Sequence, residues 1–272
     1  MKKKGVIYTC ITGMYDELLN HSYIDPYWDY ICFTDNLSIR NEHDFKWEIR
    51  KISFDKLDNV RNQRWHKLHP HVLFPEYENS IWVDGSIDIC GKSVFNDVDT
   101  AINDARPISI GPHPKRDCVY DEWDVCIKKG KDDELVMKRQ IDLMKKKGFP
   151  SHVGLFETSI IYRKNHDLTI KKLMDEWWWW IKNYSRRDQL SFTYVLWQNN
   201  ITITLLSDNP YRKNPEIRIL VGKNHITKEE ILAQAKKRRK GFKKINSSIR
   251  ALSDSLRKKV SLFFVGSIRD KK

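Results

Sequence analysis

The chain has 272 residues, and its 40% hydrophobic and 12% aromatic content is enough to fill a sizeable core, which excludes an intrinsically disordered protein. Its 49 Lys and Arg against 36 Asp and Glu give a formal net charge of +13. Residues 228–272 hold 15 Lys and Arg and 4 Asp and Glu, so they carry +11 of that charge and leave the preceding body near +2. This distribution argues against a basic groove across the fold and favours an electrostatic contact made by the C-terminal segment.

The sequence predicts a cytoplasmic protein that is peripheral at the inner face of the membrane. Residues 6–12 are too short and too polar at their edges for a signal peptide, and no apolar run approaches the roughly 20 residues that a membrane span needs. The cysteines are odd in number and lack the paired short spacing of a structural zinc site, so we expect reduced core thiols. They are Cys10, Cys32, Cys90, Cys118 and Cys126.

Apolar runs rich in β-branched residues alternate with amphipathic segments along the chain. The predicted strands are residues 5–12, 30–33, 47–52, 80–90 (a pair), 108–111, 156–162 and 201–206. The predicted helices are residues 58–73, limited by Pro70, then 93–104, 132–147, 168–183 and 188–197. This alternation indicates one α/β domain over residues 1–225, with a mostly parallel central sheet flanked by helices, and a basic helical extension over residues 226–272.

Two aspartates are predicted to lie where strands of the sheet end. Asp35 follows the second strand and Asp84 follows a central one, and ligand sites in α/β sheets gather at the carboxyl ends of parallel strands. Asp88 lies four residues after Asp84 and would project to the same side if the strand continued. Carboxylates together with the Ser86 hydroxyl suit Mn²⁺ or Mg²⁺. Spacing alone leaves a structural role open, because an aspartate at a strand end is common.

Six sequence runs, taken together and in order, resemble one known family. The runs are residues 7–16, 30–35, 61–70, 81–88, 154–158 and 187–192. The family was first catalogued as a domain of unknown function and later grouped with plant mucilage-related glycosyltransferases (TOD/MUCI-like), and the resemblance covers residues 5–210. It is in turn similar to GT-A enzymes such as glycosyltransferase family 8. The resemblance therefore implies a GT-A-like fold and sugar transfer from a nucleoside-diphosphate sugar, with a UDP-sugar favoured.

The resemblance also implies roles for individual residues. By analogy with GT-A enzymes, Asp35 would contact the base, Arg61 or Lys67 the phosphates, and Asp84 the ribose or a metal ion. Thr9 and His113 complete the predicted donor-binding residues.

The metal site departs from the pattern of the GT-A enzymes, in which a strand ends in Asp-x-Asp and a later histidine completes the site. Ser86 stands here in place of the second aspartate. Three alternatives remain open. Asp88 substitutes for it, or His225 and the lone Asp84 hold Mn²⁺ or Mg²⁺, or Arg and Lys neutralise the diphosphate without a metal.

Three carboxylates are candidate catalytic groups. Asp121 belongs to a polar segment after a strand, where we expect either a loop over the donor or acceptor or an ordinary solvated loop. Glu157 lies at the start of an otherwise apolar strand, where it could orient the acceptor or act as a base. Asp188 begins a predicted helix, and an N-cap is its structural alternative.

The basic C-terminal segment suggests where the protein acts. Phe242, Ile245, Ile249, Leu252 and Leu256 recur at helical spacing opposite basic residues, a pattern that suits an anionic membrane surface. The expected acceptor is accordingly a glycan or a lipid-linked sugar. Nucleic acid is not expected, because few aromatic residues are available for base stacking. The alternatives are a non-catalytic nucleotide-sugar or nucleic-acid binding protein that acts through this segment, and hydrolysis by the same fold.

Overall fold

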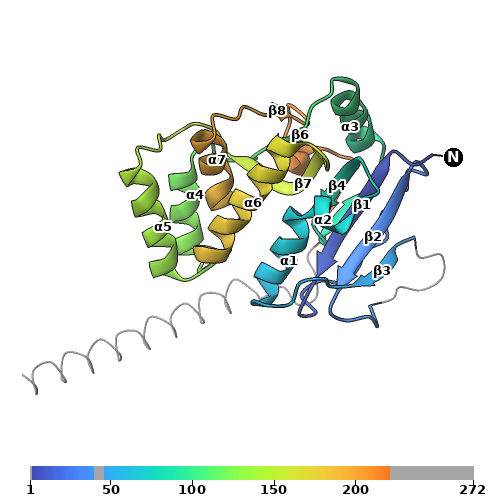
Figure 1. The fold of residues 1–272 in the computed structure, drawn as a ribbon, viewed down its shortest axis with the longest axis horizontal. Coiled ribbons are helices and arrows are strands. Elements are labelled where there is room, and N and C mark those ends of the chain that lie inside the picture. Colours follow the sequence, from blue (N-terminus) through green and yellow to red (C-terminus); the bar gives the residue numbers. More distant parts are fainter. Residues whose placement is uncertain (1, 40–45, 221–272) are drawn as a thin grey trace, which may run out of the picture. The chain divides into compact units, whose positions relative to one another are not determined.

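A seven-stranded sheet forms the centre of the molecule (Figure 1). The computed structural model describes residues 2–39 and 46–220, all within one compact unit, Met1–His225. The strand order is β3-β2-β1-β4-β7-β6-β8. The strands are β1 (Gly5–Ile11), β2 (Trp28–Thr34), β3 (Glu48–Lys51), β4 (Asn79–Val83), β6 (Ile108–Pro112), β7 (Phe156–Lys164) and β8 (Thr204–Leu205). Strand β7 runs antiparallel to β4 and β6, and all other pairs are parallel, so the predicted α/β class with a mostly parallel sheet is confirmed.

The central strands are apolar throughout because both faces of the sheet are covered. All seven residues of β1 are buried. Val6 and Tyr8 belong to the core on one face, whereas Ile7 and Ile11 belong to the core on the other, as the alternation of side chains along a strand requires. A continuous apolar run is therefore the expected sequence of such a strand.

Helices cover both faces of the sheet. They are α1 (Asn59–Leu68), α2 (Pro70–Leu73), α3 (Ser93–Asn103), α4 (Val119–Lys128), α5 (Glu134–Lys146), α6 (Leu168–Asn183), α7 (Gln189–Gln198) and the short 3-10 helix η1 (Tyr211–Lys213). Helices α1, α4, α5, α6 and α7 contribute to the core that contains Val6 and Tyr8, and α3 contributes to the other. In the described part of the chain, no helix has the length and apolar character needed to cross a membrane.

Aspartates are the N-cap residues of four of these helices, and three of them cap in the same way. The carboxylates of Asp58, Asp133 and Asp167 each accept a hydrogen bond from the backbone N–H three residues ahead. Such N-caps satisfy one of the unpaired donors in the first turn. The predicted helix over residues 58–73 is divided at His69, because Pro70 cannot continue the preceding helix and instead begins α2.

The structure corrects three parts of the predicted element order. The polar segment over residues 113–122 was expected as a loop, but from Val119 it belongs to the helix α4. The predicted strand pair at residues 80–90 is β4 followed by a turn and β5 (Ile87–Ile89). Strand β5 is not part of the main sheet and pairs with β9 (Ile217–Ile219). Strand β9 was not predicted, because the sequence there is polar. The strand predicted at 201–206 is reduced to two residues.

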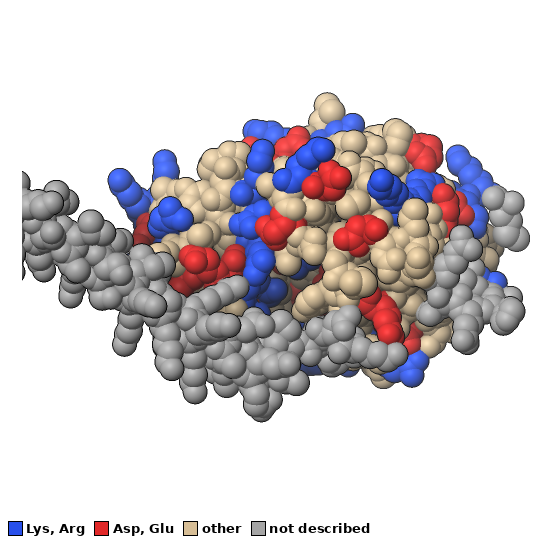
Figure 2. All heavy atoms as spheres, turned by 90° about the horizontal axis from the view of Figure 1, so that it is seen from below, with Lys and Arg blue, Asp and Glu red and all other residues tan. Residues whose placement is uncertain are grey.

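Positive and negative side chains are mixed on the surface, as expected for a body with a net charge near zero. Figure 2 shows Lys and Arg side chains interspersed with Asp and Glu side chains on one face of the described residues. The C-terminal extension expected over residues 226–272 lies outside the described residues and stays a prediction.

Candidate functional site

One edge of the main sheet collects most of the predicted site residues. The parallel strands β1, β2, β4 and β6 end at this edge, which we call the carboxyl edge. Because β7 is antiparallel, its first residues lie there too: Pro112 at the end of β6 pairs with Phe156 at the start of β7. Asp35, Asp84 and His113 directly follow β2, β4 and β6, and Glu157 is the second residue of β7.

A buried ion pair between Lys67 and Asp188 lies at the carboxyl edge. The Lys67 Nζ is 2.7 Å from Asp188 Oδ2, and neither side chain is more than 2% exposed. The Thr158 hydroxyl donates to the same oxygen at 2.9 Å, and the Arg64 Nε lies 3.3 Å from it. Asp188 also caps α7, where its Oδ1 accepts from the Gln189 N–H. Asp188 is thus both the N-cap that we gave as its structural alternative and a buried carboxylate at the carboxyl edge.

The charges around Asp188 decide its ionisation. Burial opposes the charged form, but Arg64, Lys67 and Arg187 together hold the pKa of the Asp188 carboxyl well below its usual range. Burial lowers the pKa of Lys67, against the opposing influence of Asp188 and Asp84. Both partners gain from ionising together, so we assign the pair as Lys⁺ and Asp⁻. Three cations then surround one fully buried carboxylate.

Asp84 extends this cluster toward solvent. Its Oδ1 accepts a hydrogen bond from the Trp82 indole at 2.7 Å and lies 3.4 Å from the Lys67 Nζ. Its backbone N–H donates to the Ser159 carbonyl of β7, which fixes it at the end of β4. The Asp84 side chain is 31% exposed, in contrast to that of Asp188. Asp84 can therefore reach a ligand that the inner pair cannot.

The loop after β1 lies close to the same arginines. The Gly13 N–H donates to the Asp35 carboxylate at 2.8 Å, which joins the ends of β1 and β2. Gly13 has φ +64°, and a Cβ there would collide with the side chain of Asn59, so the turn requires glycine. Burial and Asp16 raise the pKa of Tyr15, whereas the charges of Arg187, Arg64 and Arg186 oppose that shift. The hydrogen bond from Gly13 thus fixes this loop to the end of β2.

Glu157 has a separate environment. It is 2% exposed, and its Oε1 accepts from the Arg212 Nε at 2.6 Å. Its Oε2 and the Tyr211 hydroxyl are both buried without a hydrogen-bond partner among the described residues. Burial, Asp97 and Glu157 raise the pKa of Tyr211 well above its usual range. The structure thus places Glu157 beside Arg212 and Tyr211, and its catalytic role stays a prediction.

His113 and Asp121 lie on either side of the start of α4. The Nδ1 of His113 accepts from the Arg116 N–H at 3.0 Å, and its Nε2 is 3.9 Å from Glu122. Burial lowers the pKa of His113, while Glu122 opposes the shift. Asp121 is exposed in the first turn of α4, beside Cys118 and not in a loop as expected.

Two predicted donor-binding residues are engaged elsewhere in the fold. The guanidinium of Arg61 donates to the Asp58 carboxylate and to the Ile181 and Tyr184 carbonyls at the end of α6. Thr9 is 2% exposed inside β1, and its hydroxyl has no hydrogen-bond partner in the described part of the chain. These contacts assign Arg61 to joining α1 and α6, and they do not test a role in donor binding for either residue.

Asp84 and Asp88, two of the three predicted metal ligands, have different hydrogen-bond partners. Asp88 lies on β5, where its carboxylate accepts from the Ser22 N–H and hydroxyl and from Arg218 at 2.6 Å. The Asp84 carboxylate faces Trp82 and Lys67 instead. His225 lies outside the described residues. Of the three candidates, Asp84 is therefore the one that the structure places at the carboxyl edge.

Sequence reasoning missed Arg64, Thr158 and Arg187. A signal for two of them was present: Arg64 precedes Lys67 by three residues and so shares its helix face, and Arg187 precedes Asp188. Thr158 offered no signal, because threonine is an ordinary strand residue.

A family model for the TOD1/MUCI70 glycosyltransferase-like domain matches residues 38–216, well over half of the chain. The chain belongs to this family. The match spans α1, β4, β7 and α7, and so contains Lys67, Asp84 and Asp188. No curated protein matches the chain.

Three solved glycosyltransferase structures share a similar arrangement with this TOD1/MUCI70 domain. The bifunctional glycosyltransferase WbbM has 10% identity and a TM-score of 0.42 over 75% of this chain, which spans 39% of WbbM. Mouse xyloside xylosyltransferase 1 has 10% identity and a TM-score of 0.44 over 75% of this chain and 84% of its own. GlyE of Streptococcus pneumoniae TIGR4 has 11% identity and a TM-score of 0.43 over 88% of this chain and 64% of its own.

Proposed function

We propose that this domain transfers a sugar from a nucleoside-diphosphate sugar, with a UDP-sugar favoured, to a glycan or lipid-linked acceptor. Membership of a glycosyltransferase-like family supports the reaction class. The observation that carries the proposal is the cluster of Lys67, Arg64 and Arg187 around Asp188, at the edge of the sheet where α/β proteins bind nucleotides.

The cations match the chemistry of the leaving group. When the acceptor hydroxyl attacks the anomeric carbon, the bond to the diphosphate breaks and negative charge accumulates on the departing phosphate. Fixed positive charges in a water-poor site stabilise that charge without reorganising. Asp188 orients the Lys67 ammonium, and in this proposal Asp84 accepts a hydrogen bond from the ribose. The proton of the acceptor requires a base, for which Glu157 is our candidate because one of its carboxylate oxygens has no hydrogen-bond partner among the described residues.

The described residues do not assemble a complete Mn²⁺ or Mg²⁺ site of the Asp-x-Asp kind. Asp88 is engaged with Ser22 and Arg218, and the Asp84 carboxylate has the Lys67 ammonium beside it. We therefore assign neutralisation of the diphosphate to Arg64 and Arg187, with the buried Lys67 ammonium contributing its charge without touching the ligand.

Calorimetric titration of the full chain with UDP, GDP and their sugars, with and without Mn²⁺, tests this proposal. We expect one nucleotide to bind the wild type and to bind Asp84→Ala at least tenfold more weakly. Lys138→Ala, which removes an exposed lysine on α5, serves as the matched control and should bind like the wild type. Equal binding by Asp84→Ala and the wild type, or binding of no nucleotide, would overturn the donor site. A strict requirement for Mn²⁺ would overturn the assignment of neutralisation to the cations alone.

We also propose that residues 226–272 hold the enzyme at an anionic membrane surface on the cytoplasmic side. The +11 charge of residues 228–272 supports this location. If the segment instead carries the main activity, as in a non-catalytic binding protein, its removal abolishes binding of the principal ligand.

A further inference from the structure

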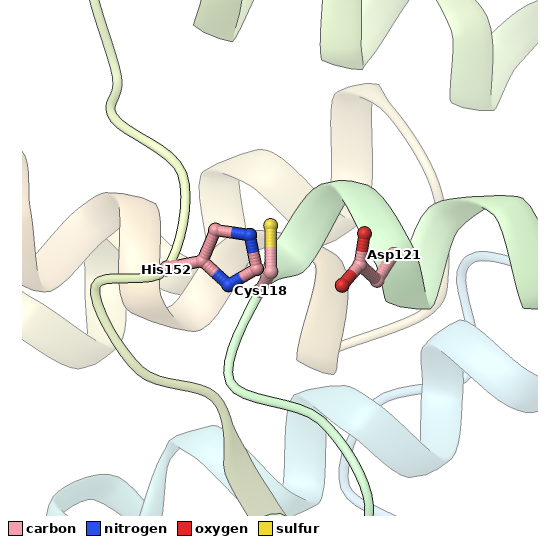
Figure 3. Close-up of side chains that lie close together, drawn as sticks. All are labelled: Cys118, Asp121 and His152. Carbon is pink, nitrogen blue, oxygen red and sulfur yellow. The ribbon is translucent and has the colours of Figure 1, made fainter.

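Three side chains with metal-binding atoms meet at the start of α4, apart from the cluster around Asp188. They are Cys118, Asp121 and His152, and one ligand atom from each lies within 4.8 Å of the other two. Cys118 and Asp121 belong to the first turn of α4, and His152 comes from the loop between α5 and β7 (Figure 3). We propose that these residues form a three-ligand site for Zn²⁺.

The three donor atoms suit zinc better than Mg²⁺ or Mn²⁺. Thiolate and imidazole are typical zinc ligands, whereas the harder ions favour oxygen. Zinc bonds of about 2.0–2.3 Å at tetrahedral angles put ligand atoms roughly 3.3–3.8 Å apart, so these atoms need to approach by at most about 1.5 Å. Asp121 and His152 are exposed and can rotate toward the buried Cys118. The approach therefore requires side-chain rotation and no change of fold.

The surroundings prepare two of the ligands. The Nδ1 of His152 donates to the Asp117 carboxylate at 2.9 Å, which leaves the lone pair for a metal ion on Nε2. A carboxylate that orients a histidine in this way is the usual outer partner of a zinc-bound imidazole. Cys118 is the N-cap residue of α4 and is 2% exposed, so the start of the helix fixes its position.

A zinc ion here would join two segments that border the carboxyl edge. One segment connects β6 to α4, and the other leads into β7 five residues before Glu157. The Gly154 N–H already donates to the Asp117 carbonyl at 2.9 Å, so the segments are in contact without the ion. With three protein ligands, the fourth position is left for water. This site is independent of the proposed sugar transfer, because Asp84 and Lys67 take no part in it.

Zinc titration of the full chain in competition with a chromophoric chelator, after removal of metal with EDTA, tests the proposal. We expect the wild type to bind one more zinc equivalent than Cys118→Ser or His152→Ala. Asp117→Asn should bind that equivalent about 10- to 100-fold more weakly. Cys90→Ser is the matched control, because Cys90 is a half-buried cysteine on the other sheet, and it should behave like the wild type.

Cobalt provides a second readout that depends on the ligand type. Co²⁺ bound at this site should show a thiolate-to-metal absorption band that is lost in Cys118→Ser and kept in Cys90→Ser. Far-ultraviolet circular dichroism of each variant checks that it is folded, and the exposed His152 gives a variant that does not disturb the core. Equal zinc stoichiometry and affinity in the wild type and His152→Ala, or a Co²⁺ complex without a thiolate band, would overturn the proposal.

Discussion

Lys67 is fully buried, and its ammonium contacts Asp188 at 2.7 Å and Asp84 at 3.4 Å. Lys67→Met should lower the free energy of unfolding by about 3 kcal/mol, because it leaves the buried Asp188 carboxylate without its closest cation. Urea unfolding measures this loss. The exposed pair of Lys138 with Asp142 provides the control, and Lys138→Met should change stability by less than about 0.5 kcal/mol. Equal stabilities of the two variants would contradict a buried ionic role for Lys67.

The fold stabilises the neutral form of His66, so the free energy of unfolding depends on pH. Its Nδ1 donates to the Asn62 carbonyl and its Nε2 accepts from the Ser53 N–H, both at 2.8 Å, so protonation of Nε2 breaks the second bond. Burial lowers the pKa of His66 to about 4 from an ordinary value near 6.5. A depressed pKa means that the unfolded state takes up the proton first. The stabilisation is therefore full above pH 6.5 and is lost as pH falls from 6.5 toward 4.

Between pH 7 and pH 5, His66 alone should lower the free energy of unfolding by about 2 kcal/mol. Urea unfolding at both pH values measures the drop. His66→Gln should be less stable than the wild type at pH 7 but should show a drop smaller by that amount. If the variant and the wild type lose the same stability, another group controls this pH range.

At the scale of elements, Arg61 links α1 to the end of α6. Its guanidinium donates to the Ile181 and Tyr184 carbonyls, which lack partners inside their own helix. Arg61→Lys should reduce the free energy of unfolding by about 1–2 kcal/mol, because an ammonium cannot match both carbonyls and Asp58 together. Nucleotide binding should be unchanged in calorimetry. Loss of nucleotide binding with unchanged stability would instead support the phosphate-contacting role predicted from the family resemblance.

The accuracy of the sequence predictions varied with the type of element. Long apolar or periodic segments such as β1, β7 and α6 were predicted well, because burial on one or both faces leaves a clear pattern. Helix α4 was missed because the charged residues around Asp121 resembled a solvated loop. Strand β9 has three residues and depends on pairing with β5, a contact that local pattern does not encode.

The candidate site shows the same difference between features that a local sequence pattern predicts and contacts that depend on the tertiary fold. Strand ends predicted Asp35 and Asp84 at one edge, because the carboxyl ends of parallel strands coincide. Glu157, at the start of β7, lies at this edge because β7 is antiparallel, which the sequence did not predict. The contact of Lys67 with Asp188 could not be predicted, since the two residues are 121 positions apart in the sequence and only the tertiary fold brings them together. Asp88 was expected beside Asp84 because the chain was assumed to continue as one strand, whereas the turn after Asp84 carries it to a second sheet.

At the scale of the whole molecule, we expect the basic segment over residues 226–272 to act separately from the α/β domain. We expect a chain truncated after residue 225 to bind nucleotide and to unfold like the full chain. It should fail to bind vesicles that contain anionic lipid, where the full chain should bind at low salt and dissociate as salt rises. Sedimentation with vesicles measures the binding to lipid, and calorimetry measures the binding of nucleotide. Loss of nucleotide binding on truncation would favour the non-catalytic alternative.

The 121 residues between Lys67 and Asp188 also set an order of events during protein synthesis. At about 5–20 residues per second, a ribosome adds Asp188 roughly 6–24 s after Lys67. Throughout that interval, Lys67 and Arg64 have no carboxylate from α7 and remain hydrated. A nascent chain that stops before Asp188 can contain a complete α1 and still lack the Lys67–Asp188 pair, so this part of the site forms only after residue 188 has been added.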